Sequence, residues 1–245
     1  MIDIHNHILP GVDDGSDSLK LSRFLLREAI EEDIHDVCIT PHFMKHGPYR
    51  IRKKELLSLF EEFRKKVSDL DVNLYLGNEL YIDRELDVLL NNDEICTLNN
   101  SSYVLVEFPF EKYKKEYDEY LYNISLSYKI IIAHPERYAY VKSDHNFVDR
   151  WLKEGYYLQA NSTSLLTRES RNAIYSFIEK GKLSLMASDA HNEYRPLSLI
   201  EAYDLIERRF SYETAHLLMD VNPLRVLKDR PIKKAEPVRK HLFKF

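Results

Sequence analysis

Histidines and acidic residues that could bind metal ions follow short apolar segments throughout this chain. The nine candidates are His5, His7, Asp14, His42, Glu79, Glu107, His134, Asp189 and His191. Neutral imidazoles and carboxylates suit hard or borderline divalent ions. Five imidazoles and four carboxylates are more ligands than one ion accepts, so the set predicts a cluster of two or three ions. Such clusters activate water and polarise substrate oxygens, and the sequence therefore predicts a multinuclear metallohydrolase.

Two pairs of candidates are spaced two residues apart, so that on a strand both side chains of a pair lie on the same face. His5 and His7 lie two residues apart at the end of a predicted strand, where residues i and i+2 point the same way. Asp189 and His191 repeat this spacing at the end of the last predicted strand. Each pair can therefore direct both side chains at one ion.

The remaining acids leave alternatives open. We choose Asp14 over Asp13 as a ligand, because Asp13 could instead cap the turn that follows it. Glu79 follows an apolar strand, where an unpaired carboxylate is unfavourable, and its two oxygens could bridge two ions. Glu107 also follows an apolar strand, and it could instead be the acid of a buried ion pair.

Two arginines are close in sequence to candidate ligands. Arg137 stands three residues after His134, and its guanidinium could bind a phosphate group with two hydrogen bonds. Arg195 stands four residues after His191 and is a second candidate. Either could instead be a surface arginine.

Two candidate histidines also have an alternative interpretation. His42 and His134 each end a strand beside a proline, and instead of binding metal each could be a core histidine hydrogen-bonded to a carbonyl.

Alternating strands and helices predict the fold class. The predicted strands cover 2–7, 36–40, 73–77, 103–108, 130–134, 156–161 and 183–188. Helix-period segments cover 18–32, 51–70, 113–127, 144–154, 168–180 and 196–210, with a short final helix over 219–228. This alternation predicts an α/β fold with a parallel sheet, and seven strands indicate a distorted (β/α)7 barrel. Ligands at the ends of such strands converge on one mouth.

Length and composition limit the possible classes. The chain has 245 residues and 44% hydrophobic residues, and residues 1–228 are predicted to form a single domain. Residues 229–245 are predicted to be a solvated basic tail, with Arg230, Lys233, Lys234, Arg239 and Lys240. A net charge of -5 argues against nucleic acid as the main partner. No segment approaches the roughly 20 apolar residues of a membrane span.

Cysteine usage and the amino terminus favour a cytoplasmic protein. Cys38 and Cys96 are too few for a disulfide framework, and the first residues lack a signal peptide. The cysteine-dependent phosphatase loop needs an arginine six residues after its cysteine. Here those positions hold Met44 and Ser102, so a thiol nucleophile is disfavoured.

Four motifs resemble those of the PHP superfamily, named for polymerase and histidinol phosphatase. They are His5-Asn6-His7, Thr40-Pro41-His42, Ala133-His134-Pro135-Glu136-Arg137 and Ser188-Asp189-Ala190-His191. Residues 1–15 resemble more narrowly the bacterial metal-dependent protein-tyrosine phosphatases of capsule and exopolysaccharide operons. Further matches are Gly77-Asn78-Glu79, residues 103–108, Gln159-Ala160-Asn161-Ser162 and Asn222-Pro223. The likeness extends to about residue 228.

The resemblance implies a distorted seven-stranded barrel with up to three metal ions, most often manganese, although iron, cobalt or zinc would also suit the ligands. It places the first ion at His5, His7, Glu79 and Asp189. It places the second at Glu79, Glu107 and His134, and the third at Asp14, His42 and His191. We assign catalysis to Arg137, Asp189 and His42, and substrate binding to Arg137 and Arg195.

The resemblance also implies a reaction. Ions would lower the pKa of a bound water, and the hydroxide would attack the phosphorus of a phosphotyrosine in line. The expected substrate is a phosphotyrosine protein, such as the tail of a bacterial tyrosine kinase that regulates capsule or exopolysaccharide synthesis. Histidinol phosphatases of the superfamily often have histidine where Asp14 and Glu107 stand, which favours the tyrosine-phosphatase branch. The alternatives are a small-molecule phosphomonoesterase such as histidinol phosphatase, an amidohydrolase and a silent binding module.

Overall fold

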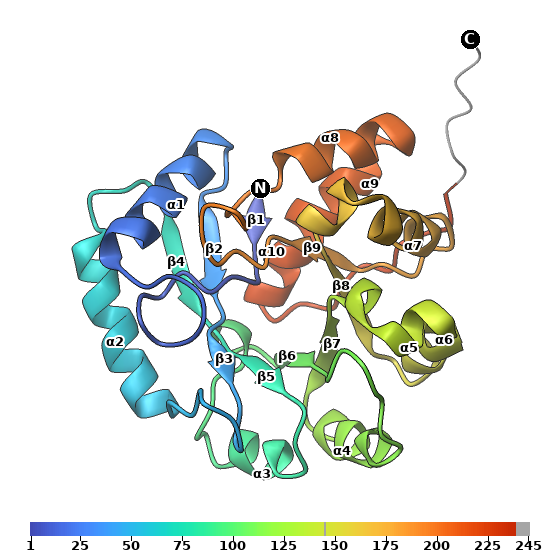
Figure 1. Ribbon diagram of the computed structural model, residues 1–245, viewed down its shortest axis with the longest axis horizontal. Helices are drawn as coiled ribbons and strands as arrows, with labels where there is room; N and C mark the ends of the chain where they lie inside the picture. The colour runs from blue at the N-terminus through green and yellow to red at the C-terminus, as the bar shows by residue number, and fades with distance from the viewer. Residues whose placement is uncertain (145, 239–245) are drawn as a thin grey trace.

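The computed structural model describes residues 1–144 and 146–238, and its strands form two parallel sheets (Figure 1). The strands are β1 Ile2–Asp3, β2 Asp36–Ile39, β3 His42–Phe43, β4 Asn73–Leu76, β5 Glu79–Tyr81, β6 Tyr103–Glu107, β7 Lys129–Ala133, β8 Tyr157–Asn161 and β9 Leu185–Ala187. One sheet has the order β1-β2-β4, and the other has the order β3-β5-β6-β7-β8-β9. The predicted α/β class with a parallel sheet is confirmed.

The two sheets continue each other at two breaks that the sequence did not reveal. Strand β2 leads to β3 through Thr40 and Pro41, and β4 leads to β5 through Gly77 and Asn78. Pro41 has no N–H for a ladder hydrogen bond. A Cβ at Gly77 would lie only 2.7 Å from Leu98 Cδ2, so glycine permits this close approach. The strands predicted over 36–40 and 73–77 are therefore correct but are followed by the unpredicted β3 and β5.

Backbone hydrogen bonds join the last strand to the first. The N–H of Asp189 donates to the carbonyl of His5 over 2.8 Å, and the N–H of His7 donates to the carbonyl of Ala190 over 2.8 Å. Asn6 and Ala190 form an isolated parallel bridge. The strand predicted over 2–7 is thus a short β1 followed by this bridge. Figure 1 shows the strands at the centre, with helices around them.

Helices cover the outer face of the strands. They are α1 Leu19–Glu31, α2 Lys53–Lys66, α3 Leu86–Asn91, α4 Glu116–Ser125, α5 Ala139–Ser143, α6 Asn146–Lys153, α7 Arg168–Glu179, α8 Ile200–Arg209, α9 Tyr212–His216 and α10 Asn222–Leu227. Short helical turns are η1 Leu98–Asn100, η2 Pro135–Arg137, η3 Thr163–Leu166 and η4 Leu217–Val221. The long predicted helices correspond to α1, α2, α4, α6, α7 and α8. The predicted span 144–154 includes residue 145, which lies outside the described residues.

Local sequence explains where α1 begins and how it packs. The hydroxyl of Ser18 accepts a hydrogen bond from the N–H of Leu21, which caps the first turn. Leu25, Leu26 and Ala29 are buried, because they fall on the face that meets the sheet. This packing fixes the loop before α1, which carries the first acidic candidates.

An apolar cluster fills the space inside the strands. Ile4, Leu105, Ile131 and Leu185 are fully buried in it, beside the equally buried Cys38. The interior is therefore a packed core, as in other βα barrels, and the functional groups are confined to one end of the strands.

The segment after α10 is more ordered than a free tail. The hydroxyl of Tyr103 donates to the carbonyl of Arg230 over 2.8 Å and accepts from the N–H of Ile232 over 3.0 Å. The side chain of Asn222 pairs with both backbone groups of Lys233. The backbone of residues 229–238 is thus hydrogen-bonded to the rest of the fold, whereas the basic side chains of Arg230, Lys233 and Lys234 are exposed to solvent. Arg239 and Lys240 lie outside the described residues.

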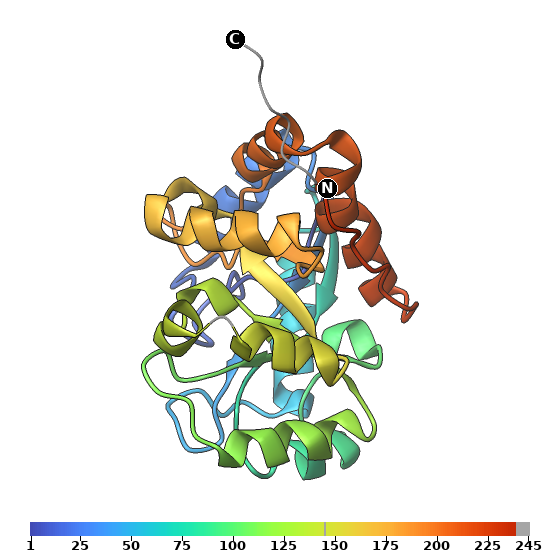
Figure 2. The ribbon, with the colours of Figure 1, turned by 90° about the vertical axis from the view of Figure 1, so that its right-hand side faces the viewer.

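The C-terminal helices cover one side of the molecule. Figure 2 shows them in red along the right-hand side, away from the end at which the yellow strand β8 points. Among the described helices, none is long and apolar enough to cross a membrane.

Candidate metal centre

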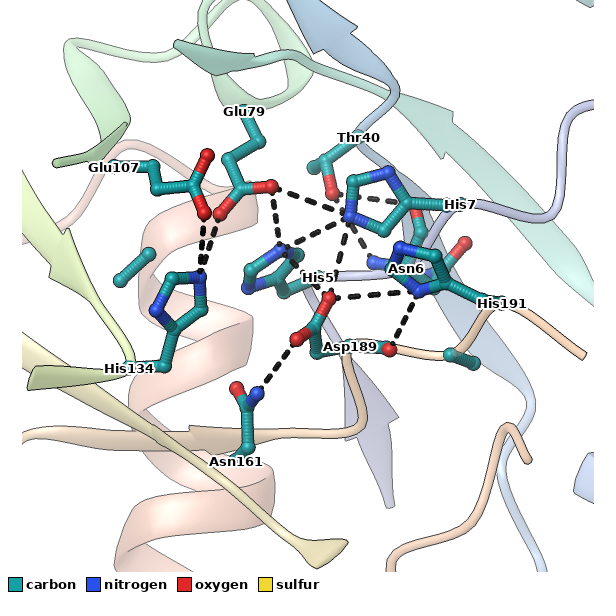
Figure 3. Close-up of polar contacts among 12 residues, drawn as sticks. His5, Asn6, His7, Thr40, Glu79, Glu107, His134, Asn161, Asp189 and His191 are labelled. Atoms are coloured by element: carbon teal, nitrogen blue, oxygen red, sulfur yellow. Dashed lines mark hydrogen bonds and ion pairs between the residues drawn. The ribbon is translucent and has the colours of Figure 1, made fainter. Parts of the chain in front are cut away.

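The nine predicted ligands lie together at the carboxyl ends of the strands. Figure 3 shows seven of them converging from opposite sides of the site. Eight have buried or nearly buried side chains, whereas the side chain of Asp14 is 51% exposed. Asp14 therefore stands at the mouth of the site, in contact with solvent.

The tightest group consists of four buried side chains. The Nε2 atoms of His5 and His7 lie 3.2 and 3.3 Å from Oε2 of Glu79. The same nitrogens lie 3.5 and 3.3 Å from Oδ1 of Asp189. Ligand atoms about 2.0–2.2 Å from an ion are roughly 3 to 3.5 Å from one another. These side chains therefore fit one metal ion.

Glu79 links this group to a second one. Its Oε1 lies 2.9 Å from Nε2 of His134, and Oε1 of Glu107 lies 3.6 Å from the same nitrogen. Oε2 of Glu79 also lies 3.0 Å from Nδ1 of His42. Both oxygens of one carboxylate thus face separate sets of donors, as a bridging ligand requires.

A third group lies at the mouth. Oδ1 of Asp14 is 3.5 Å from Nε2 of His42 and 3.8 Å from Nε2 of His191. Together with His7, these residues offer ligand atoms within 4.8 Å of one another. The structure therefore brings together every residue that the sequence predicted as a ligand.

Unpaired buried atoms support binding of ions. Oε2 of Glu79 and Nδ1 of His42 are buried and lie 3.0 Å apart, but neither atom makes a hydrogen bond of acceptable geometry with any described residue. Buried polar atoms are usually paired, because an unpaired one loses its interaction with water. Divalent ions between the three groups would satisfy both atoms.

The backbone is held in an uncommon conformation at two ligands. His134 has a φ of 32° and Asp189 a φ of 55°, in the left-handed region that side-chain-bearing residues rarely adopt. His134 directly follows β7 and Asp189 lies two residues after the end of β9, where the chain leaves the strands. Strain of this kind collects at functional sites, where surrounding contacts hold it in place.

Outer residues orient the histidines, and sequence reasoning missed them. Oδ2 of Asp13 lies 2.7 Å from Nδ1 of His7, and its Oδ1 accepts from the N–H of Gly15. Asp13 therefore both closes the turn and fixes a ligand ring. Oε1 of Gln159 lies 2.9 Å from Nδ1 of His5 and fixes that ring in the same way.

Strand β8 carried a signal that could have identified these contacts. Gln159 and Asn161 are polar residues two apart on an otherwise apolar strand, and both point inward. Nε2 of Gln159 donates to Oδ1 of Asn161 over 3.0 Å. Asn161 in turn donates to Oδ2 of Asp189 over 2.6 Å, as Figure 3 shows.

Both predicted arginines contact the same ligand oxygen as Asn161. Nη1 of Arg137 lies 2.9 Å and Nη2 of Arg195 lies 2.5 Å from Oδ2 of Asp189. The side chains are 33% and 36% exposed, so their remaining N–H groups can reach a substrate. The guanidinium of Arg137 also stacks 4.6 Å above the ring of Phe110, which fixes its direction.

Burial and neighbouring charges shift the pKa values of the ligands in different directions. Burial, followed by the charges of Glu79 and Asp189, raises the pKa of Glu107 to about 9. Burial and the charge of His7 lower the pKa of His191 to about 3. For His7 itself, burial opposes the charged form, but the charge and hydrogen bond of Asp13, together with hydrogen bonds to Asp189 and Glu79, raise the pKa well above its usual value.

Known proteins resemble the chain over its whole length. The family model described as "Capsular polysaccharide synthesis, CpsB/CapC" matches residues 1–228. Tyrosine-protein phosphatase CpsB of Streptococcus agalactiae is 32% identical over 95% of this chain and 100% of its own. Tyrosine-protein phosphatase YwqE of Bacillus subtilis is 29% identical over 100% of both chains.

Solved structures show the same relationship. A structure from the study "Crystal structures of YwqE from Bacillus subtilis and CpsB from Streptococcus pneumoniae, unique metal-dependent tyrosine phosphatases" superposes with a TM-score of 0.91 at 28% identity, and covers 98% of this chain and 100% of that one. The lactonase Lmo2620 of Listeria monocytogenes shares the fold, with a TM-score of 0.55 at 11% identity over 95% of each chain. The narrower resemblance predicted from the sequence is thus confirmed, and the chain belongs to the CpsB/CapC family of capsular polysaccharide synthesis.

Proposed function

We propose that this chain is a metal-dependent phosphatase that hydrolyses phosphotyrosine on protein, such as the tail of a bacterial tyrosine kinase in capsule or exopolysaccharide synthesis. The observation that carries the proposal is the set of three overlapping ligand groups with two arginines beside them. Relatives named as tyrosine-protein phosphatases support the choice of substrate.

The residues divide the work. His5, His7, Glu79 and Asp189 would hold one divalent ion, and the other two groups would bring the number to two or three, with manganese the first choice. Such ions supply Lewis acidity and an activated water. Arg137 and Arg195 would bind the phosphate oxygens that face away from the cluster. Phenolate is a good leaving group, so the site does not need a strong general acid.

The experiment is turnover of a phosphotyrosine peptide against histidinol phosphate, with Mn²⁺ added and with a chelator. We expect peptide hydrolysis that a chelator abolishes and Mn²⁺ restores, together with more than one ion per chain by elemental analysis. Thiol alkylation should have little effect, since Cys38 and Cys96 are both buried. Efficient turnover of histidinol phosphate, without turnover of the peptide, would favour the small-molecule phosphatase.

Metal binding is expected to release protons. The pKa of Glu107 is about 9, so at neutral pH this carboxyl is protonated in the metal-free protein and must lose its proton to become a ligand. His7, with a raised pKa, must do the same. Metal affinity should therefore rise as pH increases toward about 9.

Calorimetry can measure this release. Titration of Mn²⁺ in two buffers of different ionisation enthalpy should give different heats, and Glu107→Gln should reduce the difference. Equal heats in both buffers would show that the ligands are already deprotonated.

A further inference from the structure

A groove of about 800 Å³ adjoins the metal centre, and apart from Arg137 none of the residues that line it has a role in the chemistry described above. Its walls come from α1, from η3, and from residues 193–202, which lead into α8. Arg137 lines the groove and also donates to Asp189 within the metal centre. The groove is therefore continuous with the place where a phosphate would bind. In Figure 1, α1, α8 and α7 follow one another along the upper side of the molecule.

Exposed apolar side chains gather along this groove. Phe24, Leu166, Tyr194 and Ile200 line it, and they are four of the ten large apolar or aromatic side chains that are exposed among the described residues. Tyr194 is 91% exposed although it lies between His191 and Arg195. Apolar side chains concentrated at one place on a surface mark an interaction site.

The groove is also acidic. Glu28, Glu193 and Glu201 line it with exposed side chains, and none has an ion-pair partner within residues 1–144 and 146–238. Glu32 is different, because its carboxylate accepts from Ser198 and from the backbone where α8 begins. Of the described residues that line the groove, Arg137 alone is cationic.

The single arginine and the glutamates of the groove favour two different parts of a substrate. A phosphate group is drawn to Arg137 and repelled by the glutamates, so the rest of the groove cannot serve a second phosphate. Unpaired carboxylates beside apolar walls instead complement a polypeptide with cationic and apolar side chains.

We propose that this groove binds the polypeptide next to the phosphotyrosine and favours substrates with lysine or arginine and an apolar or aromatic residue beside it. The inference rests on the proposed phosphotyrosine activity and adds a sequence preference to it. The glutamates on α1 and α8 read charge, and Tyr194 supplies a large apolar contact at little conformational cost.

The test compares peptides that differ only in flanking charge. The full chain, loaded with Mn²⁺, is assayed on a phosphotyrosine peptide flanked by lysines, on the same peptide flanked by glutamates, and on free phosphotyrosine. We expect a lower KM for the lysine peptide, and this preference should shrink as salt concentration rises. Glu28→Gln combined with Glu201→Gln should raise the KM for the lysine peptide about three- to tenfold. Turnover of free phosphotyrosine should not change.

Matched variants elsewhere provide the control. Glu119→Gln combined with Glu154→Gln makes the same chemical change at exposed sites outside the groove, and it should leave every KM unchanged. Tyr194→Ala should raise the KM of a peptide with an aromatic neighbour about fivefold, whereas Tyr122→Ala on α4 should not.

The outcomes of these assays distinguish failure of the groove proposal from failure of the proposed phosphatase activity. Equal KM values for the lysine and glutamate peptides, with normal turnover of both, would overturn the groove and leave the phosphatase assignment intact. No turnover of peptides or of free phosphotyrosine by the metal-loaded protein would overturn both.

Discussion

Glu79→Gln should remove metal and activity together, with kcat/KM falling by more than about 100-fold, because even residues that only support metal ligands are worth about 10–100-fold. The carboxylate of Glu79 faces four imidazoles. Its Oε2 lies within 3.3 Å of nitrogens on His5, His7 and His42, and its Oε1 lies 2.9 Å from His134. A neutral amide can offer one oxygen but cannot supply the negative charge shared between two ions.

The measurement is metal content and kinetics on the same sample. Glutamine has nearly the size of glutamate, so circular dichroism should show an intact fold. Glu119→Gln makes the same change at an exposed position of α4 and should behave as the parent. Near-normal turnover with full metal content in Glu79→Gln would place the bridging ligand elsewhere.

The ligand set could be predicted because parallel strands place their carboxyl ends together. An i, i+2 pair such as His5 and His7 points to one face, and an acid after an apolar strand has few favourable environments. These are local features, so sequence alone carries them. The same argument predicted the fold class, since short buried strands alternated with amphipathic helices.

Contacts between distant parts of the chain could not be predicted in this way. Nothing near Asp189 indicates that Asn161, Arg137 and Arg195 all donate to its Oδ2. Likewise the charge of residues 229–238 indicated contact with solvent, whereas their backbone groups are hydrogen-bonded to Tyr103 of β6 and Asn222 of α10. Such contacts depend on which segments the fold brings together.

Arg137→Ala should lower kcat/KM by about 100- to 1000-fold, or about 2.7–4 kcal/mol, by analogy with the loss of one donor at a transition state. The guanidinium can bind phosphate oxygens with two hydrogen bonds, which is why Arg137→Lys should recover only part of the activity. Arg64→Ala, an exposed arginine on α2, is the matched control.

Because Arg137 contacts Asp189, a loss of activity in Arg137→Ala could also come from a loss of metal. Measuring the metal content distinguishes the two causes. If Arg137 acted only by holding Asp189, Arg137→Ala would lose metal, and added Mn²⁺ would restore turnover. We expect the opposite, because Arg195 and Asn161 still donate to Oδ2 of Asp189. Metal content should stay near that of the parent while turnover of a phosphotyrosine peptide falls. If excess Mn²⁺ restored the turnover lost in Arg137→Ala, Arg137 would be a positioning residue for Asp189. Arg195 would then be the remaining candidate for binding the phosphate.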